Sequence, residues 1–331
     1  MQIFHCPDCG KPLYFDNLRC RCGLEVAFDP DAQTMVTNAA TCANRSRIDC
    51  NWVAEADGLC RSCRMTETVP DLTSDGNLTL WSRAEASKRW MLAGLTRWGW
   101  FGPDDPGDRP RFRMLSEQTR TGSASIIMGH ADGEITINVT EASDAELRRR
   151  QEDMGELYRT MLGHMRHETA HFLHIRLSED PAFVEGFRAL FGDERADYGE
   201  ALERHYEAPR PADEDHVTSY ATAHPHEDWA ETLAHLMHLT DMLDSGSAAG
   251  LALPGGPPPG TDAYAIEDTD RLVSGAISLS IAVNHVNRAM DLADLYPFVL
   301  APGVRRKLAF AHGHLRATAH GTGAAGLRPA V

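Results

Sequence analysis

The eight cysteines of this 331-residue chain all lie between residues 6 and 63, and the 268 residues after them contain none. Such clustering indicates either a disulfide framework or thiolate ligation of metal ions. The first residues carry neither a basic stretch nor an apolar stretch, so no secretory signal is visible and we expect a cytoplasmic protein. Because thiols stay reduced in the cytoplasm, metal ligation is the better interpretation.

The cysteines form two sets of four. The first set consists of two close pairs separated by ten residues: Cys6, Cys9, Cys20 and Cys22. The second set has a looser first pair: Cys42, Cys50, Cys60 and Cys63. Zinc prefers four tetrahedral soft ligands, and each close pair can supply two of them from a tight turn. We therefore predict two structural zinc ions, the alternative being one zinc site with four ordinary thiols.

The charge of the chain argues against nucleic acid as a partner. The chain has 48 acidic and 32 basic residues, a formal net charge of −16, and residues 1–72 alone have ten acidic and seven basic residues. Phosphate binding requires clustered Lys and Arg. We expect the cysteine-rich head to be structural or to dock a protein partner, with metal binding supplying the folding free energy that a short core lacks.

The residues beyond the head predict an α+β domain that is mostly helical. The stretch 70–76 is rich in turn residues, so we place a boundary between a head at 1–72 and a body at 73–331. A helical periodicity spans 81–98, and strands are expected at 125–128 and 134–139 around the turn Asp132-Gly133. No apolar run of eighteen residues occurs, so no membrane span is predicted.

The motif His167-Glu168-Thr169-Ala170-His171 carries the candidate chemistry. On a helix, residues four apart point the same way, so His167 and His171 can bind one metal ion. Glu168 lies on the neighbouring face, where its carboxylate can take a proton from water. Zinc lowers the pKa of a bound water to about 7, which suits hydrolysis at neutral pH. The alternative is a polar helix face that happens to hold histidines.

The third metal ligand is expected at the acidic start of another predicted helix, later in the chain. Pro225 can begin a helix, and Glu227 and Glu231 then lie one turn apart on one face. We predict that Glu227 binds the zinc and that Glu231 accepts the N–H of a ligating histidine. Asp228 is the main rival for the ligand. The donor that stabilises the transition state stays open among three candidates near Glu227: Tyr220, His224 and His226.

Several separate motifs resemble one known family. They are Cys42-Ala43-Asn44, Cys50-Asn51-Trp52, Cys60-Arg61-Ser62-Cys63, Arg166-His167-Glu168, Phe191-Gly192-Asp193, His205-Tyr206-Glu207, His224-Pro225 with Glu227-Asp228, and Tyr296-Pro297-Phe298. Because these motifs occur in one order along the chain, the chain resembles the bacterial zinc-binding metallopeptidases that carry an N-terminal zinc-ribbon region. The resemblance runs from Cys6 to about His312.

The resemblance implies a zincin-like catalytic domain of the gluzincin type. In such a domain, Glu227-x-x-Ala230-Glu231 is similar to the helix that supplies the glutamate ligand. Glu231 departs from the family pattern, because related enzymes have Asp or Asn at this position. By analogy with that fold, the strand 134–139 is expected to be the edge that pairs with an extended peptide.

Together these observations predict a zinc-dependent hydrolase that cleaves peptides or proteins, with one catalytic and two structural zinc ions. Glu168 is the expected general base and then the proton donor to the leaving amine. The rival is an inactive scaffold, stabilised by zinc, whose head recruits a protein partner. Glu168 speaks against this rival, because a purely structural site needs no base and is closed by four protein ligands.

Overall fold

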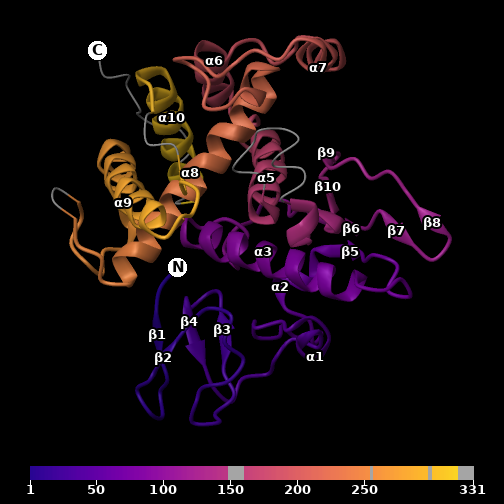
Figure 1. The fold of residues 1–331 in the computed structure, drawn as a ribbon, viewed down its shortest axis with the longest axis vertical. Coiled ribbons are helices and arrows are strands. Elements are labelled where there is room, and N and C mark those ends of the chain that lie inside the picture. Colours follow the sequence, from indigo (N-terminus) through magenta and orange to yellow (C-terminus); the bar gives the residue numbers. More distant parts are fainter. Residues whose placement is uncertain (148–159, 254–255, 297–299, 320–331) are drawn as a thin grey trace. The chain divides into compact units, whose positions relative to one another are not determined.

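The computed structural model describes residues 1–147, 160–253, 256–296 and 300–319 (Figure 1). The chain forms two compact units, Met1–Thr169 and Ala170–Val331, and the division falls inside helix α5 (Met161–Leu177). Helices dominate the described residues and strands are few and short, so the predicted mostly helical α+β class is confirmed.

The cysteine-rich head of unit 1 consists of short hairpins and helices: β1 (Phe4–His5), β2 (Pro12–Leu13), β3 (Ala27–Asp29), β4 (Thr34–Val36), α1 (Arg45–Ile48) and α2 (Arg61–Arg64). Strands β1 and β2 pair antiparallel, and so do β3 and β4. Phe28 is fully buried, and its ring contacts those of Phe4, Phe15 and Trp52 at centroid distances of 5.8, 4.9 and 6.0 Å. Buried aliphatic side chains, among them Leu13, Val26 and Ile48, complete the small core of the head.

Helix α3 (Asn77–Arg97) packs against the head within unit 1. The predicted helix 81–98 is confirmed, with a start four residues earlier. Ser82 Oγ donates to the carbonyl of Ile48 at 3.0 Å, and the rings of Trp90 and Phe15 meet edge to face at 5.2 Å. The helix therefore connects the head to the strands that come after it in the chain.

A four-stranded sheet completes unit 1, in the order β5 (Thr66–Thr68), β6 (Arg111–Leu115), β10 (Glu134–Asn138) and β9 (Gly129–Ala131). Strands β5, β6 and β10 are parallel, and β9 is antiparallel to β10. Two further strands, β7 (Gln118–Thr119) and β8 (Gly122–Ser123), pair with each other, and η1 (Val139–Ala142) comes directly after β10. Strand β5 precedes residue 72 and pairs with β6, so the sheet contains strands from both sides of the predicted domain boundary. The boundary at residue 72 stays a prediction.

The hairpin around Asp132-Gly133 is present, but two details of the prediction were wrong. Both turn residues have positive φ, 50° and 76°, as a two-residue hairpin requires. Such a tight turn pairs Ala131 with Glu134, so the first strand is Gly129–Ala131 and the stretch 125–128 has no regular structure. Strand β10 lies between β6 and β9, so it is not the expected edge strand, and its backbone groups already serve two neighbours.

Unit 2 is built around α8 (Pro225–Ala248), which contacts α6 (Pro181–Phe191), α9 (Thr269–Ala289) and α10 (Pro302–Ala319) (Figure 1). The remaining elements are α7 (Tyr198–Glu207), η2 (Tyr220–Thr222) and η3 (Ala263–Ala265). Trp229 is fully buried and meets the rings of Phe183, Phe191 and Phe310. No helix among the described residues is long and apolar enough to cross a membrane.

Candidate metal centres

Helix α5 presents the two histidines of the motif one turn apart. Met165, Ala170 and Leu173 are buried on this helix, while His167 and His171 are half-buried. The indole nitrogen of Trp229 donates to the carbonyl of Ala170 at 2.8 Å, which fixes α8 against the part of α5 that belongs to unit 2. Glu168 comes directly after His167 and is 7% exposed.

Glu227 lies in the first turn of α8. Pro225 occupies the first helical position, and the side chain of His224 caps the helix by accepting the backbone N–H of His226 at 3.1 Å. Glu227 is 1% exposed, and its Oε1 lies 3.5 Å from Nε2 of His171. The helix start therefore aims a buried carboxylate at a histidine of α5.

His167, His171 and Glu227 form a group that could hold a metal ion. Each offers one ligand atom, and these atoms lie within 4.8 Å of one another. Two ligands about 2.1 Å from zinc at the tetrahedral angle are about 3.4 Å apart, which the 3.5 Å separation of His171 and Glu227 matches. Two imidazoles and one carboxylate are a donor set that zinc accepts with a fourth position left open.

The cysteines form two further groups, which correspond to the two sets of the sequence: Cys6, Cys9, Cys20, Cys22, and Cys42, Cys50, Cys60, Cys63. Sulfur atoms are 3.5 Å apart in Cys9 and Cys20, and 3.6 Å apart in Cys50 and Cys60. Thiolates about 2.3 Å from one zinc ion lie about 3.8 Å apart, whereas a disulfide bond is about 2 Å long. The geometry thus fits two four-thiolate zinc sites and no disulfide.

The two cysteine groups differ in exposure. All four cysteines of the second group are buried, whereas Cys22 of the first group is exposed. A hydrogen bond from the backbone N–H of Cys9 contributes most to lowering the pKa of Cys6 to about 7. The neighbouring thiols donate to Cys42 and hold its pKa well below the ordinary value. The hydrogen bonds with Cys42 raise the pKa of Cys60 and of Cys63 in turn, and the pKa of Cys22 is raised as well. Each group therefore holds at least one cysteine that favours the thiolate, which is the form that binds metal.

Residues 77–314 match the family described as "putative zinc-binding metallo-peptidase". The chain belongs to this metallopeptidase family. Residues 3–41 and 37–74 each match a zinc-ribbon domain family, so each cysteine group falls within one match. The resemblance inferred from the sequence motifs is thereby confirmed.

Relatives of this family member occur in mycobacteria. An uncharacterized protein of Mycobacterium bovis and uncharacterized proteins of two strains of Mycobacterium tuberculosis are each 37% identical to it over 327 residues. These alignments cover 94% of this chain and 94% of each relative. No solved structure matches the chain.

Asp228, the rival ligand in this family member, has a different partner. Its Oδ2 accepts a hydrogen bond from Nζ of Lys307, which is also buried, and lies 3.8 Å from Nε2 of His216. Burial raises the pKa of Asp228 to about 6, against the lowering influence of Lys307. The structure thus places Glu227, and not Asp228, in the candidate metal group, while Asp228 joins α8 to α10. The choice of ligand stays a prediction.

Glu231 lies one turn after Glu227 and is also buried. Its Oε2 accepts a hydrogen bond from Oγ1 of Thr218 at 2.8 Å. The predicted bond from a ligating histidine to Glu231 stays a prediction. The acids at the start of α8 therefore contact different residues: Glu227 lies beside His171, Asp228 binds Lys307, and Glu231 binds Thr218.

The three donor candidates differ in how their polar atoms are used. His224 accepts the N–H of His226 with Nδ1, and its Nε2 lies 3.1 Å from the carbonyl of Ala196, so both ring nitrogens bind backbone. The His226 ring stacks on that of His224, and burial lowers the pKa of His226 to about 4. Burial, with the nearby charge of Glu227, raises the pKa of Tyr220 far above its usual range, so its hydroxyl keeps its proton.

The sequence analysis missed Tyr198, the first residue of α7. Its hydroxyl donates to Oε1 of Glu227 at 2.5 Å. Asp197 caps this helix by accepting the N–H of Glu200 at 2.9 Å, which sets the position of Tyr198. The cap is visible in the sequence, but no local pattern relates a helix start at residue 198 to an acid 29 residues later.

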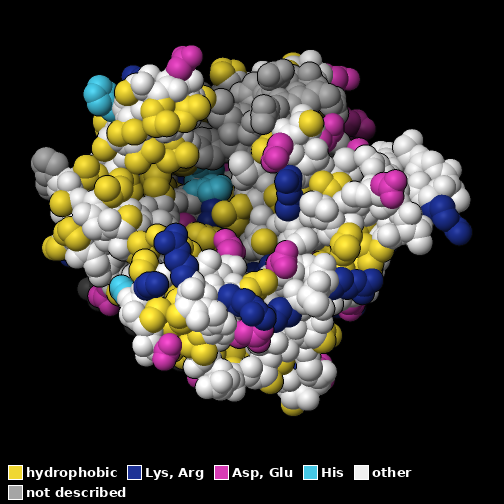
Figure 2. Space-filling model, turned by 60° about the horizontal axis from the view of Figure 1, so that its bottom comes forward, with side chains coloured by type: hydrophobic (Ala, Val, Ile, Leu, Met, Phe, Trp, Pro, Cys, Tyr) yellow, Lys and Arg dark blue, Asp and Glu magenta, His cyan; other side chains and the backbone are white. Residues whose placement is uncertain are grey.

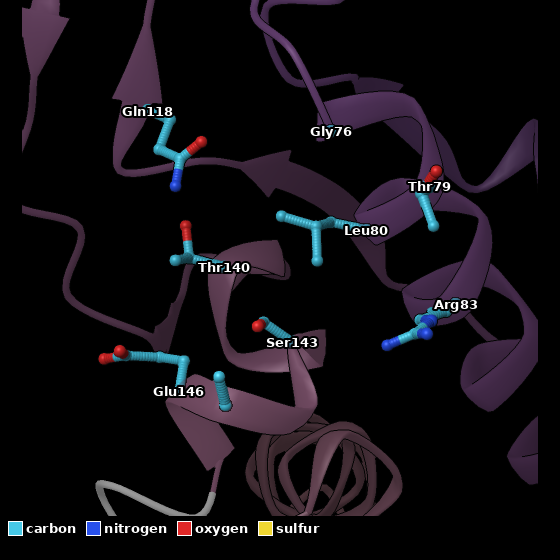
Figure 3. A pocket seen from close by; sticks show the side chains of 9 residues that line it. Gly76, Thr79, Leu80, Arg83, Gln118, Thr140, Ser143 and Glu146 are labelled. Carbon is cyan, nitrogen blue, oxygen red and sulfur yellow. The ribbon is translucent and has the colours of Figure 1, made fainter.

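A separate cavity of about 560 Å³ lies in unit 1 beside the start of α3 (Figure 3). Figure 3 shows the side chains of Gln118, Thr140 and Leu80 at its wall. Two charged residues, Arg83 and Glu146, line it, and Arg83 donates to the carbonyl of Ala142 at 3.0 Å and lies 3.4 Å from Asp144. None of the predicted metal ligands is among the described residues that line it.

Proposed function

We propose that this protein is a zinc-dependent peptidase of the gluzincin type. His167, His171 and Glu227 would hold the catalytic zinc, and the two cysteine groups would hold structural zinc. The single observation that carries the proposal is the convergence of the three donor atoms within 4.8 Å, with Glu168 next to one of them. The match to a metallopeptidase family supports the same reaction class.

When bound at this group, zinc supplies a Lewis acid that polarises the scissile carbonyl and lowers the pKa of a water to about 7. Glu168 takes a proton from the attacking water and passes it to the nitrogen of the leaving amine. Its low exposure keeps bulk water from competing for that proton. Tyr198 orients the carboxylate of Glu227 through the 2.5 Å hydrogen bond, so that one oxygen faces His171.

The charge distribution supports a peptide and not a nucleic acid as the substrate. Figure 2 shows Lys and Arg side chains interspersed with Asp and Glu on the visible face. Together with the net charge of −16, this arrangement offers no strong attraction for a phosphate backbone.

The proposal is tested with a peptide library and metal exchange. Purified protein should cleave library peptides, lose this activity after chelation, and regain it when one equivalent of zinc is restored to the body site. His171→Ala should lose the body zinc and the activity, whereas His285→Ala, a change of an exposed histidine on α9, should lose neither. Cleavage that persists after complete removal of zinc, or a full zinc content in His171→Ala, would contradict the proposal.

A further inference from the structure

Arg89 is a buried cation whose charge acts on the carboxylate of Asp16 without forming an ion pair with it. It lies in the middle of α3 and is 2% exposed. Within the part of the chain that the structure describes, its guanidinium forms no ion pair, and its Nη1 atom has no hydrogen-bond partner. A buried charge is costly unless an opposite charge compensates it, so a counter-charge is expected nearby.

The guanidinium of Arg89 contacts the residues on both sides of Cys50. Its Nε donates to Oδ1 of Asn51 at 2.8 Å, and its Nη2 lies 3.4 Å from the carbonyl of Asp49. Asn51 is itself held by a 2.7 Å hydrogen bond from its amide to the carbonyl of Phe15. Arg89 is therefore fixed beside a cysteine of the second group.

The second cysteine group would itself carry an excess of negative charge. Four thiolates and one Zn²⁺ have a net charge of −2, and all four cysteines are buried. Water cannot screen this charge, so protein groups have to compensate it. The backbone N–H groups of Cys60 and Cys63 donate to sulfur atoms of the group, and a nearby cation adds to their effect. Glu85 and Lys88, also on α3, are fully buried but pair with each other at 3.0 Å, which leaves Arg89 as the net positive charge of this helix segment.

We propose that Arg89 is the counter-charge of the zinc site formed by Cys42, Cys50, Cys60 and Cys63. Zinc binding by the second group and the packing of α3 on the head then stabilise each other. The site is thus part of the framework of unit 1, and not only an attachment point for a partner. This proposal depends on zinc in the head and is independent of peptidase activity.

The contacts of α3 extend this coupling to the sheet. Cys63 ends the second group, and strand β5 begins three residues later at Thr66. Thr66 donates to Glu85 at 2.5 Å and accepts a hydrogen bond from Lys88, while the backbone N–H of Phe112 in β6 donates to the carbonyl of Met65 at 2.7 Å. Metal loss from the second group would therefore loosen α3 and the edge strand β5 together.

The test follows the release of metal from the second site in the full chain as the pH is lowered. All variants are made in a protein that carries Cys6→Ser and Cys9→Ser, which disable the first site. Cobalt replaces zinc in these proteins, so that sulfur-to-cobalt absorption reports the second site. Three charged groups also act in this region: Asp16, whose pKa is raised by burial against the influence of Arg89, and the pair of Glu85 and Lys88. All three are left unchanged in every variant.

Arg89→Gln should release cobalt at a pH higher by about half a unit or more, because thiolates without a nearby cation take up protons more readily. Arg89→Lys, which keeps the charge, should release it near the wild-type pH. Arg47→Gln removes an exposed charge three residues before Cys50 and should change nothing.

Two results would overturn the proposal: an unchanged release pH in Arg89→Gln, or the same upward shift in Arg89→Lys. If Arg89→Gln does not fold, the lysine variant still decides, because a charge-compensating role requires it to keep the metal at the wild-type pH. Release of cobalt from Arg89→Lys near the wild-type pH supports the proposal, and release at a higher pH contradicts it.

Discussion

The hydroxyl of Tyr198 donates a 2.5 Å hydrogen bond to Oε1 of Glu227, the same oxygen that lies 3.5 Å from Nε2 of His171. One phenol on α7 thus orients the carboxylate that α8 directs toward α5. Hydrogen bonds to a metal-binding carboxylate fix its orientation and tune its affinity for the metal.

Removing this hydroxyl should weaken the binding of zinc at the body site. We expect Tyr198→Phe to lower the zinc affinity of that site by roughly ten- to a hundredfold, because the carboxylate of Glu227 loses its orienting donor. A competition titration with a chelating dye measures the affinity. Tyr206→Phe is the matched control, since Tyr206 lies on the same helix and is 69% exposed. Equal affinities of Tyr198→Phe and wild type would refute the role of Tyr198.

Glu227 and Asp228 should respond differently to substitution. Glu227→Ala should abolish zinc at the body site, because it removes the carboxylate of the candidate group. Asp228→Asn should keep the zinc but lower the free energy of unfolding by about 3 kcal/mol, since it leaves the Lys307 charge buried and unpaired. Metal analysis and urea unfolding measure the two effects. Zinc retained in Glu227→Ala but lost in Asp228→Asn would reverse the assignment.

Glu231 should tune the body site without being essential to it. Glu231→Ala is expected to lower zinc affinity by roughly ten- to a hundredfold, as the loss of a residue that supports a ligand does. Thr218→Val removes the hydroxyl that donates to Glu231 and separates the effect of that contact from any contact with a histidine. If Glu231→Ala abolished zinc binding altogether, Glu231 would be a ligand.

The metal content of the head should reflect two independent thiolate sites. Fresh, reduced protein is expected to contain about three zinc ions, two in the head and one in the body. Replacing Cys6 and Cys9 by Ser should remove one of them and leave the body zinc in place. A chelator should also empty the first group before the second, because Cys22 is exposed whereas the second group is buried. A total of one zinc ion per chain would rule out the two-site head.

His312 should make the protein less stable in mild acid. Burial lowers the pKa of His312 to about 4, against an ordinary value of 6.5. Between these values the unfolded chain binds a proton that the folded chain does not, so stability is full above about pH 6.5 and falls as the pH drops toward 4. The loss amounts to about 3 kcal/mol. His312→Gln should show a smaller fall in urea unfolding across this range, and an identical pH dependence would disprove the prediction.

Features with a local signal in the chain could be predicted from the sequence. His167 and His171 are four apart on one helix, Pro225 marks a helix start, and Asp132-Gly133 marks a hairpin, so each was found from its neighbours in the chain. The third member of the metal group, Glu227, could be proposed from the helix register. Spacing alone could not distinguish it from its neighbour Asp228.

The contacts that distinguish these residues are long-range. Lys307 is 79 residues from Asp228, and Tyr198 is 29 residues from Glu227, so neither pair leaves a periodic signal. The order of strands in the sheet is equally non-local: β10 pairs with β6, although three other strands, β7, β8 and β9, lie between them in the sequence. Only the packed chain shows that β10 is central and that β9 is the edge.

The most direct test of a peptidase mechanism compares the wild-type protein with Glu168→Gln on the same peptide library. The substitution keeps the size and hydrogen bonding of the side chain but removes the proton acceptor. We predict that Glu168→Gln keeps its fold and its full zinc content while cleavage falls by several orders of magnitude. Equal cleavage by the two zinc-loaded proteins would contradict this account.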